Sequence, residues 1–166
     1  SIDLSHNLHQ GTIPITGYQE NEEIFEIDLS RNRFHGAPDH RLGLMSQLGT
    51  LNLAYNQLNS TMDGWESHEV RHGEFALKLI LTNNSISGQL PFLNGSRVTF
   101  LDVSNNRLSG SIPVLPNGLG TLDLSGNDIT GSLDNVLRCP LLTSLNLADN
   151  RLSGTMPAIL FTMPLL

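Results

Sequence analysis

One six-residue phrase recurs along this chain, and its regular spacing restricts the possible folds more than any other feature. The seven copies read IDLSHN, IDLSRN, LNLAYN, LILTNN, LDVSNN, LDLSGN and LNLADN. They end at Asn7, Asn32, Asn56, Asn84, Asn106, Asn127 and Asn150, with spacings of 25, 24, 28, 22, 21 and 23 residues. A period in the twenties predicts a solenoid in which each copy forms one coil, because a single coil cannot bury its apolar face alone.

The alternation within the phrase predicts one short strand per coil. Successive side chains of a strand point to opposite faces, so we expect Leu122 and Leu124 to point inward and Asp123 and Ser125 to face the concave side. The Asn that ends each phrase is expected inside the solenoid, where its amide satisfies buried backbone groups and stacked coils form an Asn ladder. These structural roles account for much of the 30 Leu and 16 Asn among 166 residues.

A second motif follows the strand phrase in several coils. The chain reads RLSGSIP after Asn106, RLSGTMP after Asn150 and SISGQLP after Asn84, which is an N-x-L-x-G-x-I-P pattern. This pattern resembles the plant-type leucine-rich repeat of receptor-like kinase ectodomains and polygalacturonase-inhibiting proteins. Residues 36–38, 60–63 and 131–134 match it only in part. The resemblance implies an α/β right-handed solenoid of about seven coils, with short parallel strands on the concave face and extended or short helical turns on the convex face.

Composition excludes several classes of function. A formal net charge of −7 without a basic run argues against a nucleic-acid partner. No apolar stretch reaches the roughly 18 residues of a membrane-spanning helix, so membrane attachment is expected only through a segment that this sequence lacks. The single cysteine, Cys139, rules out an internal disulfide framework and is interpreted as a buried, unreactive thiol. No nucleotide-binding glycine motif occurs, and we expect no cofactor.

The whole of residues 1–166 is predicted to be a single solenoid domain. Solenoids need polar capping repeats over their terminal cores, and neither end of the sequence has one. We therefore expect the sequence to be a window of a longer chain with flanking repeats.

The longest coil contains a motif with catalytic associations. Residues 68–72 read H-E-x-x-H, which in zinc proteases places two imidazoles on one helix face with Glu as general base. The next strand phrase resumes around Ala76, which leaves no room for a supporting helix and a third ligand. A zinc hydrolase, an incidental metal contact and a solvated charged turn are the alternatives, and the spacing favours the turn. Trp65 in the same coil either anchors a partner on the convex side or packs against the arc.

Outward strand positions are expected to form ladders across the concave face. One ladder is acidic, with Asp3, Asp28, Asp102 and Asp123, which suggests calcium or a basic ligand. Because the sequence motif L-D-L-S is frequent in the family that the chain resembles, we interpret this acidic stripe as part of the scaffold.

Coils two to five differ from the L-D-L-S motif and contain the candidate partner-binding site. Aromatic and Arg side chains dominate binding energy at interfaces, so large apolar groups exposed among charges indicate a partner. The predicted site consists of Phe25, Glu26, Arg31, Tyr55, Lys78, Ile80 and Phe100. Leu77 is also expected to point outward, the alternative being that Leu77 and Phe100 tuck under their neighbours.

Three N-glycosylation sequons occur, at Asn59, Asn83 and Asn94. Chance alone predicts a similar number in a chain with 16 Asn, so the sequons do not decide the compartment. The family resemblance favours a secreted or cell-surface ectodomain, and a cytoplasmic location stays open.

Taken together, these features favour a non-catalytic recognition scaffold that binds a protein, peptide or glycan on its concave face. The alternative is a structural module of an extracellular fibre or large complex, and the remote alternative is a zinc hydrolase. Contacts on coils two to five would indicate a receptor, whereas convex or end-on contacts would indicate an assembly module.

Overall fold

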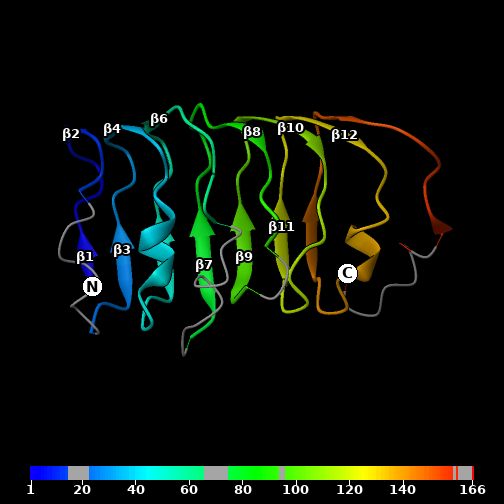
Figure 1. Ribbon diagram of the computed structural model, residues 1–166, viewed down its shortest axis with the longest axis horizontal. Helices are drawn as coiled ribbons and strands as arrows, with labels where there is room; N and C mark the ends of the chain where they lie inside the picture. Colours follow the sequence, from blue (N-terminus) through cyan, green and yellow to red (C-terminus); the bar gives the residue numbers. More distant parts are fainter. Residues whose placement is uncertain (15–22, 66–74, 94–95, 159, 161–165) are drawn as a thin grey trace.

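Seven parallel strands form one sheet along the length of the molecule. The computed structural model describes residues 1–14, 23–65, 75–93, 96–158, 160 and 166 (Figure 1). The strand order is β1-β3-β5-β7-β9-β11-β13. The strands span Ile2–Asp3 (β1), Glu26–Asp28 (β3), Thr50–Asn52 (β5), Leu77–Ile80 (β7), Val98–Asp102 (β9), Thr121–Asp123 (β11) and Ser144–Asn146 (β13). Each strand lies in or overlaps one copy of the repeated phrase, so the predicted solenoid with one strand per coil is confirmed.

Equivalent residues of neighbouring phrases pair across this sheet. Ile27 pairs with Leu51, Leu51 with Leu79, Leu79 with Leu101, and Leu101 with Leu122. All five side chains are buried. The core is therefore a column of similar aliphatic residues, because in-register coils place the same position of the repeat on top of itself.

A second set of short parallel strands runs along one edge of the solenoid, at the top of Figure 1. One sheet contains β2 (Gln10–Gly11), β4 (Arg33–Gly36) and β6 (Gln57–Leu58), and another contains β8 (Ser87–Gln89), β10 (Arg107–Ser111), β12 (Asp128–Gly131) and β14 (Arg151–Leu152). The sequence predicts extended turns outside the concave sheet but not this pairing. Gly110, inside β10, has a φ of +80°, which a residue without Cβ adopts at no steric cost.

Within the described ranges, the convex side has little helix. It includes two short 3-10 helices, His40–Leu44 (η2) and Val136–Arg138 (η4). Asp39 caps η2, since its carboxylate accepts a hydrogen bond from the backbone N–H of Arg41 at 2.9 Å. Extended segments form most of the remaining arc, so the α part of the α/β class consists of short turns. Among the described residues, no helix has the length and apolar composition needed to cross a bilayer.

The Asn that ends each phrase forms the predicted ladder. The side-chain amide of Asn106 donates to the carbonyls of Leu81 at 3.0 Å, Val103 at 3.0 Å and Ser104 at 3.1 Å, and its oxygen accepts from the backbone N–H of Ile86 at 2.9 Å. The same pattern, with three carbonyl acceptors each, recurs at Asn32, Asn56, Asn84, Asn127 and Asn150. One amide therefore links two successive coils through their backbone groups.

A partly buried arginine binds two earlier stretches of the chain together. Arg97 donates through Nη1 to the carbonyls of Leu48 and Phe75, the latter at 2.8 Å, and through Nη2 to the carbonyls of Met45 at 2.7 Å and Gly43 at 3.2 Å. Its Nε is buried without a partner, and desolvation lowers the pKa of the guanidinium. Arg97 therefore joins the end of η2 to the start of β7.

The expectation that Leu77 points outward is wrong. Leu77 is fully buried, with none of its surface exposed. It pairs with Val98, and the register shifts by a β-bulge between Leu77 and Lys78. The extra residue of this bulge is Thr99 in β9, so β7 itself keeps its strict alternation, and Leu77 points inward like Leu79 and opposite to Lys78. Of Leu77 and Lys78, Lys78 is the exposed one.

Replacing Asn106 with Ala should lower the free energy of unfolding by about 2–4 kcal/mol, because several buried backbone groups lose their partners. Urea denaturation followed by circular dichroism measures the loss. The matched control is Asn105→Gly, which removes an adjacent exposed amide at a φ of 52° that Gly tolerates, and it should cost much less. Equal losses for the two variants would contradict the ladder role of Asn106.

Replacing Arg97 with Met should cost about 3 kcal/mol or more, because four backbone carbonyls lose their donor. Trp65, the single Trp of the chain, donates to the carbonyl of Pro38 in the same arc as the carbonyls of residues 43–48 that Arg97 binds, so its fluorescence should shift to the red. Arg107→Met removes an exposed arginine and should change the unfolding free energy by no more than about 0.5 kcal/mol. An unchanged Trp65 emission in the Arg97 variant would contradict this support.

Candidate functional site

The acidic ladder of the concave face satisfies its own backbone. Asp102 and Asp123 each accept hydrogen bonds through Oδ1 from the backbone N–H and the hydroxyl of the Ser two residues later, at 2.6–3.0 Å. Asn146 donates to Oδ2 of Asp123 at 2.9 Å. Hydrogen bonds from Ser5 hold the pKa of Asp3 below its ordinary value. These contacts support the interpretation of the stripe as scaffold, and the described residues include no group of three or more His, Cys, Asp or Glu that could hold a metal ion.

The residue before each ladder Asn adopts a left-handed backbone. We call these positions the left-handed row: His6, Arg31, Tyr55, Asn83, Asn105, Gly126 and Asp149, with φ between 52° and 66°. A left-handed conformation costs an ordinary L-residue about 1–2 kcal/mol, whereas Gly, Asn and Asp tolerate it. Arg31 and Tyr55 are thus unfavourable choices for the backbone of this row.

Arg31 and Tyr55 form a contact with each other. The guanidinium carbon of Arg31 lies 4.2 Å from the centroid of the Tyr55 ring, which is cation–π geometry. Arg31 is exposed, and 45% of the surface of Tyr55 is exposed. Two side chains that strain the backbone are therefore held together at the surface of coils two and three.

A second cation lies near an aromatic ring on the neighbouring coils. Lys78 in β7 pairs with Phe100 in β9, and Nζ of Lys78 lies 5.9 Å from the Phe100 centroid. The same row of the sheet continues to Glu26 through Thr50. Phe100 is only partly buried, so this ring is available at the concave surface.

An exposed aromatic pair lies where the strands begin. Phe25 and Phe75 meet edge to face, with centroids 5.6 Å apart and planes at 85°, and they are 52% and 43% exposed. They come from coils two and four, and Gly49 of coil three makes room, since a Cβ there would lie 2.6 Å from the Phe25 ring. The sequence interpretation missed Phe75. The available signal was its place directly before a strand phrase, which Phe25 shares.

The seven predicted partner-binding residues thus fall into neighbouring groups. Arg31 contacts Tyr55, Lys78 lies near Phe100, and Glu26 begins β3 with an exposed side chain. Ile80 is partly buried in the row of the acidic ladder, between Asn52 and Asp102. Their role in binding stays a prediction.

The three sequons differ in accessibility. Asn59 is exposed, and Asn83 is partly buried in the left-handed row. Asn94 lies outside the described residues, as does the H-E-x-x-H motif at residues 68–72.

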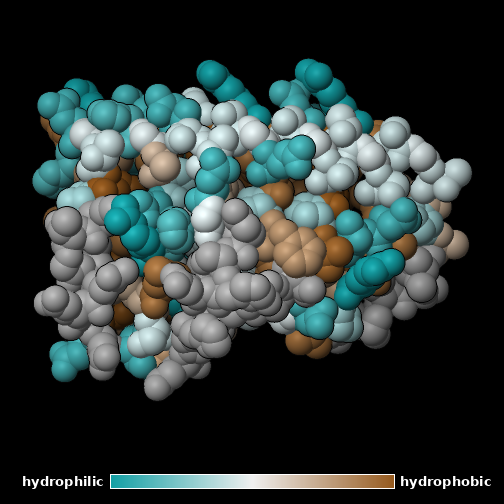
Figure 2. Space-filling model, in the orientation of Figure 1, coloured by the Kyte–Doolittle hydropathy of each residue, from teal (hydrophilic) through white to brown (hydrophobic). Residues whose placement is uncertain are grey.

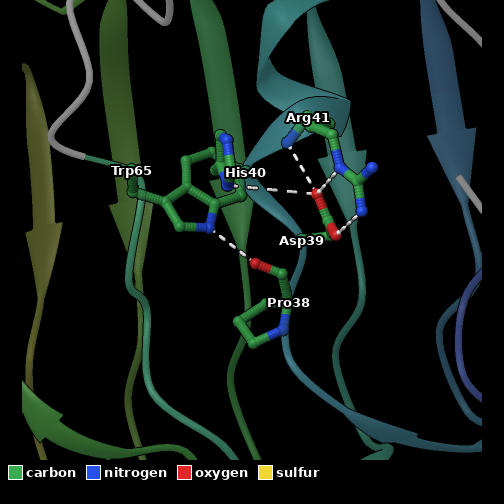
Figure 3. Close-up of polar contacts among 5 residues, drawn as sticks. All are labelled: Pro38, Asp39, His40, Arg41 and Trp65. Atoms are coloured by element: carbon green, nitrogen blue, oxygen red, sulfur yellow. Dashed lines mark hydrogen bonds and ion pairs between the residues drawn. The ribbon is translucent and has the colours of Figure 1, made fainter.

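Trp65 is a packing residue. Only 1% of its surface is exposed, and its indole N–H donates to the carbonyl of Pro38 at 2.6 Å (Figure 3). Beside it, Asp39 binds the Arg41 guanidinium, with Nη2 of Arg41 2.8 Å from Oδ2. His40 covers Gly64, where a Cβ would lie 2.3 Å from the imidazole. Trp65 therefore packs against the arc and does not present a convex anchor.

Cys139 is buried, and desolvation raises the pKa of its thiol. The thiolate is the reactive form of cysteine, so this environment makes Cys139 a poor nucleophile, as the sequence predicted.

Comparisons with known proteins agree on a family. The profile of the Leucine Rich Repeat family matches residues 97–119, 118–139 and 141–163. Receptor like protein 24 of Arabidopsis thaliana is 35% identical over 161 residues, which covers 80% of this chain and 18% of the relative. The chain spans between 10% and 18% of the length of the seven curated relatives it matches, all of which are receptor-like proteins or receptor kinases of this plant.

Solved structures share the fold across nearly the whole chain. The plant peptide hormone receptor RGFR1, in complex with RGF2, is 28% identical with a TM-score of 0.79, and the match covers 97% of this chain and 26% of that one. A plant ice-binding protein is 27% identical with a TM-score of 0.82, and the match covers 98% and 53% of the two chains. The same architecture thus occurs in proteins with different ligands, so function has to be argued from surface residues.

The backbone strain of the left-handed row can be tested separately from the contacts of its side chains. Tyr55→Gly should be more stable than Tyr55→Ala by about 1 kcal/mol, because only Gly adopts this φ without strain. At Lys78, an exposed position inside β7, the order should reverse, and Gly should be the less stable by about 0.5–1 kcal/mol. Chemical denaturation of the four variants tests this, and a Gly variant less stable than Ala at position 55 would contradict the strain.

Proposed function

Since this chain belongs to the plant-type leucine-rich repeat family, we propose that it is a non-catalytic recognition scaffold that binds a peptide or an extended protein segment on the concave face of coils two to five. The contact surface consists of the Arg31–Tyr55 pair and the Lys78–Phe100 pair, with Glu26 in β3, Ile80 in β7 and the Phe25–Phe75 pair at the strand starts. The peptide hormone complex of a similar receptor supports this class of partner.

The observation that carries the proposal is the Arg31–Tyr55 contact in a strained backbone. Residues held in unfavourable backbone regions persist where the side chain has a use that outweighs the strain. Gly, Asn or Asp would relieve the strain at both positions, and four of the other five positions of the row have one of these residues. The guanidinium and the phenol ring together offer hydrogen-bond donors and a flat apolar face, the two features that recur in interface anchors.

The chemistry of the concave face fits recognition better than catalysis. The carboxylates of Asp102 and Asp123 are engaged in scaffold hydrogen bonds. General acid–base catalysis instead needs a group within hydrogen-bond reach of a substrate and with a pKa near the operating pH.

The proposal places the chain in an extracellular ectodomain, as in the receptor-like relatives. Within such an ectodomain, Asn59 is the sequon better suited to a glycan than Asn83, because Asn59 is exposed whereas Asn83 is partly buried. Its side-chain oxygen accepts a hydrogen bond from the Gly36 backbone at 3.2 Å, which leaves the amide nitrogen for the sugar.

Peptide display tests the proposed surface. A library of random 12-residue peptides is selected on the chain, and the affinity of a selected peptide is measured by calorimetry. Changing Tyr55 and Phe100 together to Ala should weaken binding more than ten-fold, because aromatic anchors carry most of the binding energy of an interface.

The matched control is Phe92→Ala, which removes an aromatic side chain of similar exposure outside the proposed surface. It should change the affinity by less than two-fold. Unchanged affinity in the double variant, with its circular dichroism spectrum intact, would overturn the proposed surface, and a dominant effect of Phe92→Ala would move the site to the arc.

A further inference from the structure

A polar groove lies on the flank of the solenoid, away from the concave face. It has a volume of 470 Å³ and is lined by Gln10, Gly11, Arg33, His35 and Gln57, from β2, β4 and β6. This edge, at the upper left of Figure 1, is mainly hydrophilic to neutral in the space-filling view (Figure 2). Its volume is within the range of about 300–1,000 Å³ that is typical of small-ligand sites.

Strand geometry brings the four polar side chains together. Gln10 pairs with Arg33, and His35 pairs with Gln57, so three successive coils contribute to one row. Phe34, between Arg33 and His35, is buried, and its neighbours in β4 are exposed. This alternation points the side chains of Arg33 and His35 to the same outer face.

The floor of the groove is open. Gly11 has a φ of +95°, and a Cβ built there would meet nothing within 4 Å. A ligand can therefore approach the backbone at this point, which is one of the uses of Gly in a strand.

Arg33 lacks the anionic partner that two other surface arginines, Arg41 and Arg151, have. Arg41 lies 2.8 Å from a carboxylate oxygen of Asp39, and Arg151 lies 2.8 Å from one of Asp128. Within the described part of the chain, no ion pair or side-chain hydrogen bond engages the Arg33 guanidinium, and no acidic side chain lines the groove. In a chain with a net charge of −7, a cationic groove without a counter-charge favours an anionic ligand.

The groove residues point to a sugar acid. We propose that this flank groove binds an acidic saccharide, with the carboxylate of a uronic-acid residue on the Arg33 guanidinium and its hydroxyls on the amides of Gln10 and Gln57. Arg binds carboxylates through two parallel hydrogen bonds, and each Gln amide offers both donors and an acceptor to hydroxyls. The lining has no apolar side chain, so it offers no pocket for the hydrophobic anchors that peptide binding requires. Because the groove is on the flank, a saccharide there leaves the concave face free.

The test is calorimetric titration of the intact chain with trigalacturonic acid. Arg33→Gln should weaken binding at least ten-fold, because it removes a charge-assisted hydrogen-bond pair. The matched control is Arg107→Gln, since Arg107 also directly follows a ladder Asn and is exposed in β10, but does not line the groove. It should change the affinity less than two-fold, and both variants should melt like the unaltered chain.

Two further probes separate carboxylate and sugar recognition. The methyl-esterified trisaccharide has the same hydroxyls without the charge and should bind at least ten-fold more weakly, whereas the peptide Glu-Glu-Glu has the charge without the sugar and should also bind more weakly. Equal binding of the ester, tighter binding of the peptide, or equal losses from Arg33→Gln and Arg107→Gln would each overturn the proposal. None of these outcomes depends on the concave-face ligand, so the proposed function stands or falls separately.

Discussion

The side-chain amide of the ladder Asn is the interaction on which the rest of this solenoid depends. At Asn106 and its equivalents, the amide nitrogen donates to backbone carbonyls of its own coil and of the preceding coil. The amide oxygen accepts a hydrogen bond from a backbone N–H of the preceding coil. The residue before the ladder Asn adopts a left-handed backbone, which turns the amide into the interior. The backbone N–H of this preceding residue donates a hydrogen bond to the next coil, as from Tyr55 to the carbonyl of Thr82. The ladder therefore fixes the register of the concave sheet, the Leu column beneath it and the start of each flank strand.

Because backbone and core are fixed in this way, we propose that function lies in side chains that the repeat does not require. On the concave face these are the aromatic and cationic residues of coils two to five, and on the flank they are Arg33 and its neighbours. The acidic ladder shows the opposite case: Asp123 is exposed enough to attract attention, yet its oxygens serve Ser125 and Asn146. A charge in a solenoid indicates a ligand only where the scaffold leaves it without a partner.

Local patterns in the sequence predict the strands, the inward Leu residues and the Asn ladder, since alternation and period act within one repeat. Features that depend on contacts between distant residues are not predictable in this way. The bulge at Thr99 that shifts the register between β7 and β9, the reach of Arg97 to carbonyls 49–54 residues earlier, and the meeting of Phe25 with Phe75 across Gly49 all require knowledge of which coils adjoin. For Trp65, the sequence left open whether the side chain is buried, because no local pattern reveals its hydrogen bond to the carbonyl of Pro38.

The central claim is that departures from the repeat mark the ligand site, and that residues of the repeat do not. A crystal structure of the chain with a peptide selected for binding tests it most directly. The peptide should cross coils two to five, with atoms in contact with Arg31, Tyr55, Lys78 and Phe100. A peptide lying instead over Asp102 and Asp123, or on the arc beside Trp65, would contradict the claim.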